Sequence, residues 1–425
     1  MRLYDTFTRR KQELPQRPGP IRMYFCGPTV YARAHIGNAR PFVIGMWLRR
    51  WLVERGYETT LVHNITDIND KIYDAAPGAS AELAVRATDW YLKDTADFGL
   101  GMPDEQPKAT EMIPQIVATI EELIARGYAY EVRGDVYYRV SRFAEYGQLS
   151  GQRPEQVEDQ EPNARKEDPR DFALWKANKP GEDTWWDSPW GRGRPGWHIE
   201  CSVMAEELLG PAFEIHGGGL DLVFPHHENE IAQSRALGHP FAQVWMHNGM
   251  LRFVGEKMSK SAGNVATIRE ALDRWGREAL LVFFLTAHWS KPIDYSDETL
   301  TAAEARADSF REVFRNPSEP APDGEWEHFA AALDNDFNTP DTLAIMHSWR
   351  DHDLLRRALD VFGLAPLAEA EAPPAEVVEL ARERQGARSS GDFAEADRLR
   401  VAIDQLGWVV RDIGDGFQLI PKRAA

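Results

Sequence analysis

The pattern that most constrains the fold is a strand, a helix and a second strand near the start of the chain. Ile21 to Phe25 is an apolar run of strand length, Phe42 to Leu52 has the length and spacing of a helix, and Thr59 to Ile65 is a second apolar run. This order and spacing are typical of a βαβ unit and predict a parallel sheet. We therefore expect an α/β protein built on a Rossmann-like parallel-sheet domain.

Two short polar blocks lie at opposite ends of this α/β region. His35-Ile36-Gly37-Asn38 precedes the first helix, where free N–H groups favour an anionic phosphate. Lys257-Met258-Ser259-Lys260-Ser261 lies between glycines, so its ammonium groups could meet negative charge that develops on a triphosphate. Either block alone fits an ordinary solvated loop or a core histidine equally well. Together, they indicate an ATP site.

The rest of the chain divides by composition and pattern. A chain of 425 residues is too long for one compact core. We expect a helix over 109–126, a hairpin up to residue 140, strands at 213–216 and 244–251, a helix at 226–237, and a C-terminal helix followed by a hairpin over 408–420. The expected domains are two halves of the α/β domain at 1–105 and 196–262, a connective insertion at 106–195, a helical stem and bundle at 263–385 and a small α+β domain at 386–425.

Charge and cysteine content restrict partners and compartment. The formal net charge of −18 repels nucleic acid at long range, so any RNA must be held by local basic patches such as Arg9-Arg10-Lys11, Arg49-Arg50 or Lys422-Arg423. The N-terminus lacks the apolar core of a signal peptide, and the longest apolar run, Ala279 to Leu285, is too short to span a membrane. With only 2 cysteines, a disulfide framework is excluded, and we expect a cytoplasmic protein.

The two cysteines are candidate metal ligands. Cys26 follows the first strand, Cys201 ends the segment Gly196-Trp197-His198-Ile199-Glu200-Cys201, and His226 and Glu230 are four residues apart, on one face of a helix. Two thiolates, an imidazole and a carboxylate form a plausible zinc set. On spacing alone, buried inert cysteines beside surface charge explain the pattern equally well.

These blocks together resemble the class I aminoacyl-tRNA synthetases, and among them the cysteinyl-tRNA synthetases. The resemblance rests on runs that extend from Leu3 to about Leu419: Met23 to Tyr31, His35 to Arg40, Trp197 to Cys201, Ile215 to Gly219, Pro225 to Glu230 and the lysine block. Asn38 departs from the histidine usual in class I enzymes but matches the cysteine branch. The stretch between Pro340 and Ala358 is short by about a helix, which leaves the helix count of the bundle open.

The resemblance implies that the chain activates L-cysteine with ATP and Mg²⁺ and transfers it to the terminal adenosine of tRNA(Cys). By position, Cys26, Cys201, His226 and Glu230 match the family's zinc ligands. Cysteine and serine differ by one atom, and a pocket that relies on shape rejects a near-isostere by only about a hundredfold. Zinc prefers a thiolate over an alcohol, so it would supply the missing selectivity. The C-terminal domain is expected to bind the anticodon.

The resemblance also assigns roles within the site. His35 and Asn38 are expected at the ATP phosphates, and Lys260, with Lys257 second, at the triphosphate in the transition state. Other positions are expected to contact the ribose (Gly218, Asp221) or to line the cysteine pocket (Gly27, Thr29, Thr66, Trp197, His216). Judged by its residue type alone, Asp221 fits a turn equally well, and Trp197 fits a core.

Two other functions are compatible with parts of the pattern. A paralogous ligase that joins cysteine to an amino sugar would share the ATP and zinc chemistry, whereas the run Gly27 to Tyr31 and the tail from Gly386 to Ile420 favour the tRNA enzyme. A catalytically dead scaffold is disfavoured by the intact lysines and the complete ligand set. Family members are commonly monomeric, so we expect a monomer.

Overall fold

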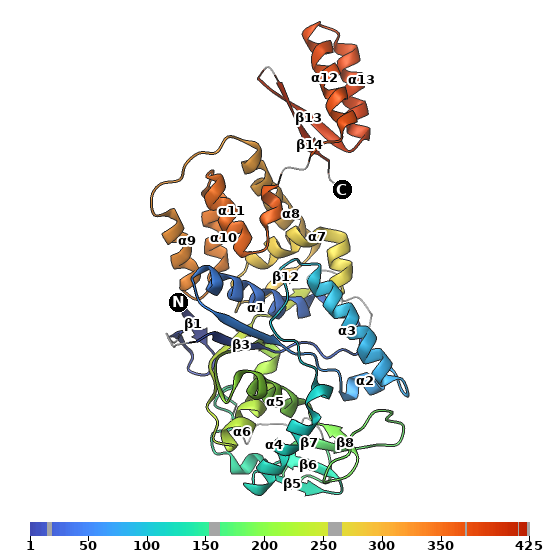
Figure 1. The fold of residues 1–425 in the computed structure, drawn as a ribbon, viewed down its shortest axis with the longest axis vertical. Coiled ribbons are helices and arrows are strands. Elements are labelled where there is room, and N and C mark those ends of the chain that lie inside the picture. Colours follow the sequence, from blue (N-terminus) through green and yellow to red (C-terminus); the bar gives the residue numbers. More distant parts are fainter. Residues whose placement is uncertain (15–18, 153–161, 254–265, 370–371, 415, 423–425) are drawn as a thin grey trace. The chain divides into compact units, whose positions relative to one another are not determined.

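The computed structural model describes residues 1–14, 19–152, 162–253, 266–369, 372–414 and 416–422. The chain forms two compact units, Met1–Ala368 and Glu369–Ala425, which are traced from blue to red in Figure 1. The lysine block at 257–261 therefore lies outside the described residues.

The first unit is built on a parallel sheet of four strands in the order β10-β9-β3-β4. These strands are β3 (Ile21–Phe25), β4 (Thr59–His63), β9 (Ala212–Gly219) and β10 (Phe241–Asn248), and every neighbouring pair is parallel. The α/β class and the expected strand–helix–strand unit are confirmed. The chain order places a topological switch at β3, between β4 on one side and β9 on the other, and ligands bind at such switch points beyond the carboxyl ends of the strands.

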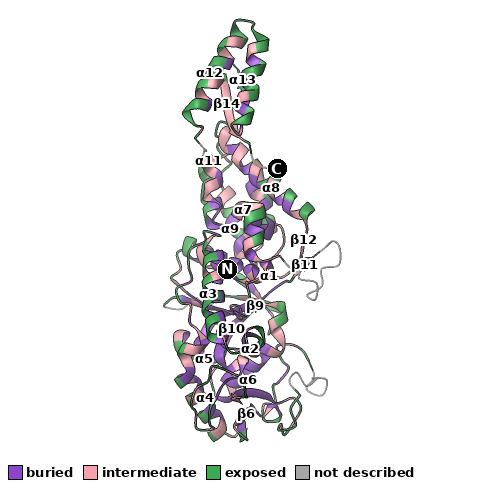
Figure 2. Ribbon diagram, turned by 90° about the vertical axis from the view of Figure 1, so that its right-hand side faces the viewer, coloured by how far each residue is buried: buried purple, intermediate pink, exposed green. Residues whose placement is uncertain are grey.

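Alternating side chains of β3 pack on the two faces of this sheet. Met23 and Phe25 join the core that contains α1 (Ile36–Glu54), while Tyr24 joins the core that contains Met204 of α5 (Trp197–Leu209). Figure 1 shows α1 on one side of the sheet and α5 on the other, and Figure 2 shows buried residues concentrated between these layers. The sheet is therefore covered on both faces, as expected for parallel strands.

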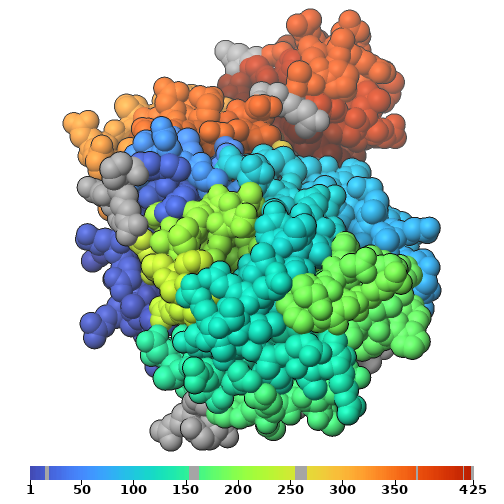
Figure 3. All heavy atoms as spheres, turned by 60° about the horizontal axis from the view of Figure 1, so that its bottom comes forward, coloured from blue at the N-terminus to red at the C-terminus, as the bar shows by residue number. Residues whose placement is uncertain are grey.

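A second, antiparallel sheet lies in the segment expected as an insertion, residues 106–195, which fills the front of the view in Figure 3. Its order is β5-β6-β7-β8, which confirms the predicted hairpin before residue 140. The helix predicted over 109–126 starts as a 3₁₀ turn, and Pro114 occupies the first turn of the α-helix that follows. The elements are α2 (Asp70–Ala75), α3 (Ser80–Ala96), η1 (Ala109–Met112), α4 (Ile113–Ala125), β5 (Ala129–Val132), β6 (Asp135–Tyr138), η2 (Val140–Arg142), β7 (Phe172–Ala177) and β8 (Gly193–Pro195).

Two predicted elements differ from the structure near the carboxyl edge of the parallel sheet. Instead of a helix from His226, a 3₁₀ turn η4 (Leu220–Leu222) and a wider π-type turn η5 (Val223–His227) precede α6 (Glu228–Ala236), and Phe224 within that turn has extended backbone angles. The strand predicted over 244–251 is divided into β10 and β11 (Leu251–Phe253). The chain leaves the sheet between them, where the Gly249 N–H donates to the carbonyl of Trp289 at 2.9 Å.

The helical part of the first unit packs on α1. Its elements are α7 (Ile268–Leu285), β12 (Ile293–Tyr295), α8 (Asp297–Arg315), α9 (Glu325–Asp334), α10 (Thr339–Ser348), α11 (His352–Val361) and η7 (Ala365–Ala368). The stretch that looked short by a helix contains α10 and α11, joined by only three residues, 349–351. Strands β1 (Arg2–Asp5) and β2 (Arg10–Glu13) form an antiparallel pair, and β1 packs beside β10.

The second unit is a helix pair on a hairpin. It contains α12 (Ala375–Ser389), α13 (Phe393–Gln405), β13 (Trp408–Ile413) and β14 (Gly416–Pro421). The C-terminal helix and the hairpin predicted over 408–420 are therefore present. The unit starts at Glu369, ahead of the expected domain start at residue 386, because α12 packs on α13. Within the described ranges of the chain, no helix is both long and apolar enough to cross a membrane.

Candidate active site and metal centre

The carboxyl ends of β3, β4 and β9 bring most of the predicted site residues to one edge of the sheet. Cys26 and Gly27 follow β3, Thr66 follows β4, and Gly218 lies at the end of β9. The Gly27 N–H donates to Asn64 Oδ1 at 2.9 Å, and a Cβ atom at Gly27 would lie only 1.7 Å from the Asn64 carbonyl oxygen. Only glycine allows β3 and β4 to approach this closely at their ends.

The four predicted metal ligands converge in the interior. Cys26 and Cys201 place their Sγ atoms 4.0 Å apart, and His226 Nε2 lies 3.3 Å from Glu230 Oε1. All four side chains are buried. The sulfur separation is far longer than the disulfide bond length of about 2.05 Å, so both cysteines are free thiols.

A further histidine, which the sequence analysis did not single out, belongs to this cluster. His227 Nε2 lies 3.4 Å from Cys26 Sγ, and its Nδ1 lies 2.8 Å from Nε2 of His247. Donor atoms of Cys26, His226, His227 and Glu230 all lie within 4.8 Å of one another. The wide turn η5 places both histidines at the cluster, a result that helical spacing does not predict, although the adjacent His-His pair was visible in the sequence.

The charges of the cluster follow from burial and from its neighbours. Burial opposes ionisation of both partners, but the pKa of Glu230 is lowered to about 2 by His216 and His226, and that of His226 is raised to about 10 by Glu230 and Cys201. The hydrogen bond from Cys26 lowers the pKa of the Cys201 thiol to about 6, whereas burial raises the pKa of Cys26. The cluster therefore holds an ionised Cys201 thiol and an ionised Glu230 carboxylate beside a protonated His226 imidazole, whereas burial lowers the pKa of His227 and keeps that ring neutral.

The separations of these donor atoms fit a zinc ion. Zinc bonds are about 2.3 Å to sulfur and about 2.0 Å to nitrogen or oxygen, so tetrahedral ligands lie about 3.3–3.8 Å apart. The distances of 4.0 Å between the thiols and 3.3 Å between His226 and Glu230 are close to this range. The buried Glu230 Oε1 also makes no hydrogen bond within the described structure, which leaves it available as a ligand.

Two of the predicted cysteine-pocket residues, Trp197 and His216, contact this cluster. Trp197 stacks on His226 with ring centroids 4.3 Å apart. Trp197 is only half-buried, so it does not belong to the core. His216 is fully buried and lies 2.5 Å from Glu230 Oε2 through its Nε2 atom. Thr29 and Thr66 lie opposite each other in a short parallel bridge between the ends of β3 and β4.

The predicted ATP residues are placed at the same edge and at the start of α1. His35 is the N-cap residue of α1, and Asn38 lies in its first turn. Gly218 packs against the His227 ring, and Asp221 lies exposed at an open pocket of about 400 Å³ between the β1–β2 hairpin and residues 149–152. Lys257 and Lys260, the other two predicted residues, fall in the undescribed part of the chain.

The fold and the site define a class I aminoacyl-tRNA synthetase. Residues 12–305 match the family model for the "tRNA synthetases class I (C) catalytic domain", and residues 371–419 match the "Cysteinyl-tRNA ligase anticodon binding domain". Among solved structures, methionyl-tRNA synthetase of Mycobacterium tuberculosis in complex with methionyl-adenylate has the same fold, with a TM-score of 0.61, 15% identity, and coverage of 81% of this chain and 88% of that chain.

Full-length relatives identify the branch. The chain is 44% identical to cysteine–tRNA ligase of Methylobacillus flagellatus, with 98% of each chain covered, and 41% identical to cysteine–tRNA ligase of Caldicellulosiruptor saccharolyticus, with 99% of each covered. The chain belongs to the cysteine–tRNA ligase family, and the resemblance seen in the sequence is confirmed. It is an ATP-using enzyme of protein biosynthesis that charges tRNA with an amino acid.

Proposed function

We propose that Cys26, Cys201, His226 and Glu230 hold a zinc ion that selects L-cysteine for attachment to tRNA(Cys). The observation that carries this proposal is the meeting of two thiols, an imidazole and a carboxylate at zinc-like separations beside the end of β3. When bound, zinc supplies a soft acceptor that accepts a thiolate and disfavours a hydroxyl.

The surrounding residues then orient the substrates. His216 holds Glu230 from the side away from His226, and Trp197 covers His226. Together with Gly27, Thr29 and Thr66, these two residues fix the amino and carboxylate groups of cysteine. Orientation of this kind can contribute several kcal/mol to the rate.

His35 and Asn38 bind the ATP phosphates, with Mg²⁺, at the start of α1, and Gly218 and Asp221 contact the ribose. Lys260 and Lys257 stabilise charge on the triphosphate, an assignment that rests on the sequence alone. The cysteine carboxylate oxygen attacks the α-phosphorus, the bond to pyrophosphate breaks, and cysteinyl-adenylate forms. A hydroxyl of the terminal adenosine of tRNA then attacks the cysteinyl carbonyl, and AMP leaves. Neither step needs a protein nucleophile, so charge stabilisation and orientation supply the catalysis.

The acceptor is tRNA rather than an amino sugar, and the match of residues 371–419 to an anticodon-binding domain supports this choice. From its place in translation, we infer that the enzyme works in the cytoplasm and that it does so as a monomer. Charging of purified tRNA(Cys), against conversion of an amino sugar, separates the two acceptors.

The test joins metal analysis to amino-acid activation. We expect roughly one zinc ion per chain and cysteine-dependent ATP–pyrophosphate exchange at least about 10⁴-fold more efficient than exchange with serine, beyond the limit of shape alone. Cys201→Ser is expected to lose zinc and most of the exchange. Met204→Leu, a buried change on the same helix that keeps the side-chain volume, is the matched control and keeps both.

The same assay decides between Cys201 and His227 as the fourth ligand. His227→Gln is expected to retain zinc, because the proposed set does not include it. A Cys201→Ser enzyme with full zinc and unchanged preference for cysteine would refute the ligand assignment, and loss of zinc in His227→Gln alone would replace Cys201 by His227.

A further inference from the structure

The starts of α1 and α7 are joined by backbone hydrogen bonds. The Ile36 N–H donates to the Ala266 carbonyl at 2.9 Å, and the Ile268 N–H donates to the Ala34 carbonyl, also at 2.9 Å. Between these bonds, His35 and Thr267 lie opposite each other as an antiparallel pair. The predicted phosphate-binding segment is therefore paired directly with the residues at which the chain enters α7.

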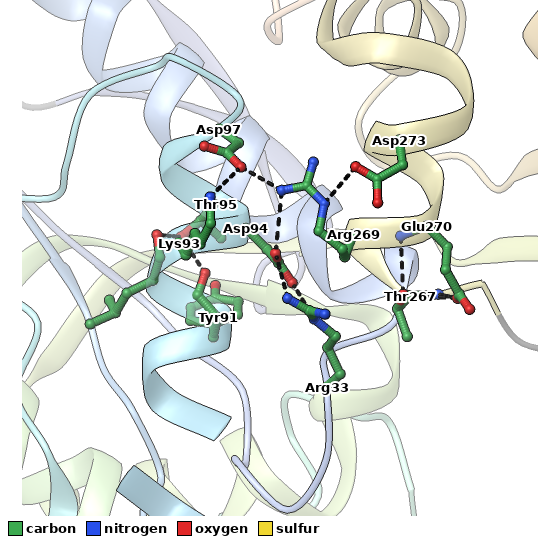
Figure 4. Close-up of polar contacts among 11 residues, drawn as sticks. Arg33, Tyr91, Lys93, Asp94, Thr95, Asp97, Thr267, Arg269, Glu270 and Asp273 are labelled. Carbon is green, nitrogen blue, oxygen red and sulfur yellow. Dashed lines mark hydrogen bonds and ion pairs between the residues drawn. The ribbon is translucent and has the colours of Figure 1, made fainter. Parts of the chain in front are cut away.

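A buried carboxylate from a third helix links the same two segments. Asp94 of α3 has no exposed side-chain area and accepts two hydrogen bonds from Arg33, from Nε at 3.1 Å and from Nη2 at 3.3 Å. Nη1 of Arg269, in the first turn of α7, lies 3.7 Å from the other side of this carboxylate. Figure 4 shows the two guanidinium groups on either side of Asp94.

Each arginine is also held by a second partner. Arg33 lies over the ring of Trp90, with 5.6 Å between its guanidinium carbon and the ring centroid. Arg269 contacts Asp97 at 2.5 Å and Asp273 at 2.9 Å. Among the described residues, Asp94 is thus the carboxylate that contacts both arginines, whereas Asp97 and Asp273 contact only Arg269.

The two helix starts differ in how their own N–H groups are capped. At α7, Thr267 and Glu270 form a reciprocal capping box, with the Glu270 N–H donating to Thr267 Oγ1 at 3.1 Å and the Thr267 N–H donating to Glu270 Oε2 at 2.7 Å. At α1, His35 makes no side-chain cap, and the first turn contains no acidic residue. A side-chain cap therefore offsets the helix dipole at the start of α7, whereas the described side chains provide no such cap at the start of α1.

We propose that Asp94 is a positioning residue for the ATP reaction, which holds the start of α1 in register with the start of α7 through Arg33 and Arg269. The inference rests on the proposed function, because it takes His35 and Asn38 as the groups that meet the phosphates. Loss of the buried charge removes the one carboxylate among the described residues that contacts both arginines, so the start of α1 shifts relative to its neighbour. A displacement of about 1 Å at a reacting group can cost about a hundredfold in rate.

The test is Asp94→Asn, which keeps the shape and removes the charge. In cysteine-dependent ATP–pyrophosphate exchange, kcat/KM for ATP is expected to fall about 10- to 100-fold, while KM for cysteine changes less than about twofold and zinc content stays the same, because the metal cluster does not touch Asp94. Asp273→Asn is the matched control. Its side chain is 65% exposed and contacts Arg269 alone, so a change within about twofold is expected.

A double-mutant cycle keeps the inference testable if Asp94→Asn does not fold. The side chains of Arg33 and Arg269 are 34% and 22% exposed, so glutamine at either position is tolerated more easily than a change at the buried Asp94. Both arginines act through Asp94. The fold decrease in kcat/KM for ATP in the double variant is therefore expected to be much smaller than the product of the fold decreases in the two single variants.

The outcomes are distinct. Unchanged ATP kinetics in Asp94→Asn, equal losses for ATP and cysteine, or strictly multiplicative losses in the cycle would each overturn the positioning role. Absence of cysteine-dependent exchange in the unaltered enzyme would instead overturn the proposed function, and the inference with it.

Discussion

The pKa of each buried ionisable group in this protein depends on the neighbour that the group faces. His226 beside Glu230 has its pKa raised to about 10, whereas the equally buried His247, for which burial is the dominant influence, has a pKa of about 3. Glu200, next to Cys201, makes no hydrogen bond within the described structure, and burial raises its pKa well above the usual range. Burial disfavours a charge everywhere here, so only groups with an opposite charge close by remain ionised.

His63 makes the acid stability of the first unit testable. Burial lowers its pKa to about 4, below the value of about 6.5 expected for the unfolded chain, and its Nε2 lies 2.6 Å from the Tyr91 hydroxyl. The folded state therefore keeps a neutral imidazole. Its contribution to stability is present above about pH 6.5 and is lost as the pH falls toward 4, because only the unfolded chain binds the proton.

We expect the unfolding free energy of the unaltered enzyme to fall by about 2 kcal/mol more between pH 7 and 4.5 than that of His63→Gln. Urea unfolding at the two pH values measures this difference. His328→Gln, at an exposed histidine, is the control and should follow the unaltered enzyme. Equal pH dependence in His63→Gln and the unaltered enzyme would contradict the assignment.

At the scale of residues, the site residues that lie in regularly spaced motifs were predicted from the sequence. Those that an irregular stretch of backbone brings to the site were missed. Cys26, Cys201, His226 and Glu230 were predicted, and the structure brings them together. His227 was missed because it enters the cluster through a π-type turn, and a 3.6-residue period places it on another face. Arg33, Asp94 and Arg269 could not be linked at all, since no local pattern connects residues so far apart in the chain.

At the scale of elements, α1 connects the site to the helical part of its unit. Its first turn carries His35 and Asn38, while Trp47, fully buried further along the helix, donates from Nε1 to the Phe362 carbonyl at 2.9 Å. Pro41 lies in the second turn of this helix. The elements that form clear apolar runs, such as α1 and β3, were predicted, whereas the break between β10 and β11 was not, because apolar residues continue across it.

Trp47→Phe tests this connection. The change leaves the buried Phe362 carbonyl without its donor and opens a small cavity, so we expect a loss of about 2–3 kcal/mol in unfolding free energy. Val53→Ala, at a side chain that is 55% exposed on the same helix, should cost less than about 0.5 kcal/mol. Chemical denaturation of both variants provides the comparison, and a loss below about 1 kcal/mol in Trp47→Phe would show that the hydrogen bond contributes little.

At the scale of the whole molecule, several cations that the sequence offered for a polyanion are paired with carboxylates in the described structure. Arg49 is paired with Asp104 at 2.6 Å, Arg50 with Asp360 at 3.1 Å, and Lys422 with Asp404 at 2.7 Å. These arginines of α1, which the sequence offered as a basic patch, stabilise the fold instead.

The two units have separate cores, which makes their contributions separable. The main core of the first unit ends at Leu367, and the core of the second consists of its own residues, Val377, Ala381, Ile403, Trp408 and Val410. A chain that ends at Ala368 therefore loses no residue of the catalytic unit's core and should fold. It also keeps every described residue of the proposed metal and ATP sites.

We expect this truncated chain to retain cysteine-dependent ATP–pyrophosphate exchange within about twofold, while kcat/KM for charging of tRNA(Cys) falls at least about tenfold, the equivalent of about 1.4 kcal/mol of lost tRNA contact. Circular dichroism and thermal unfolding of the truncated chain serve as the control for folding. A folded truncated enzyme that charged tRNA as well as the full chain would contradict anticodon binding by the second unit. One that folded but lost amino-acid activation would instead show that the second unit supports the catalytic site itself, because activation requires cysteine and ATP but no tRNA.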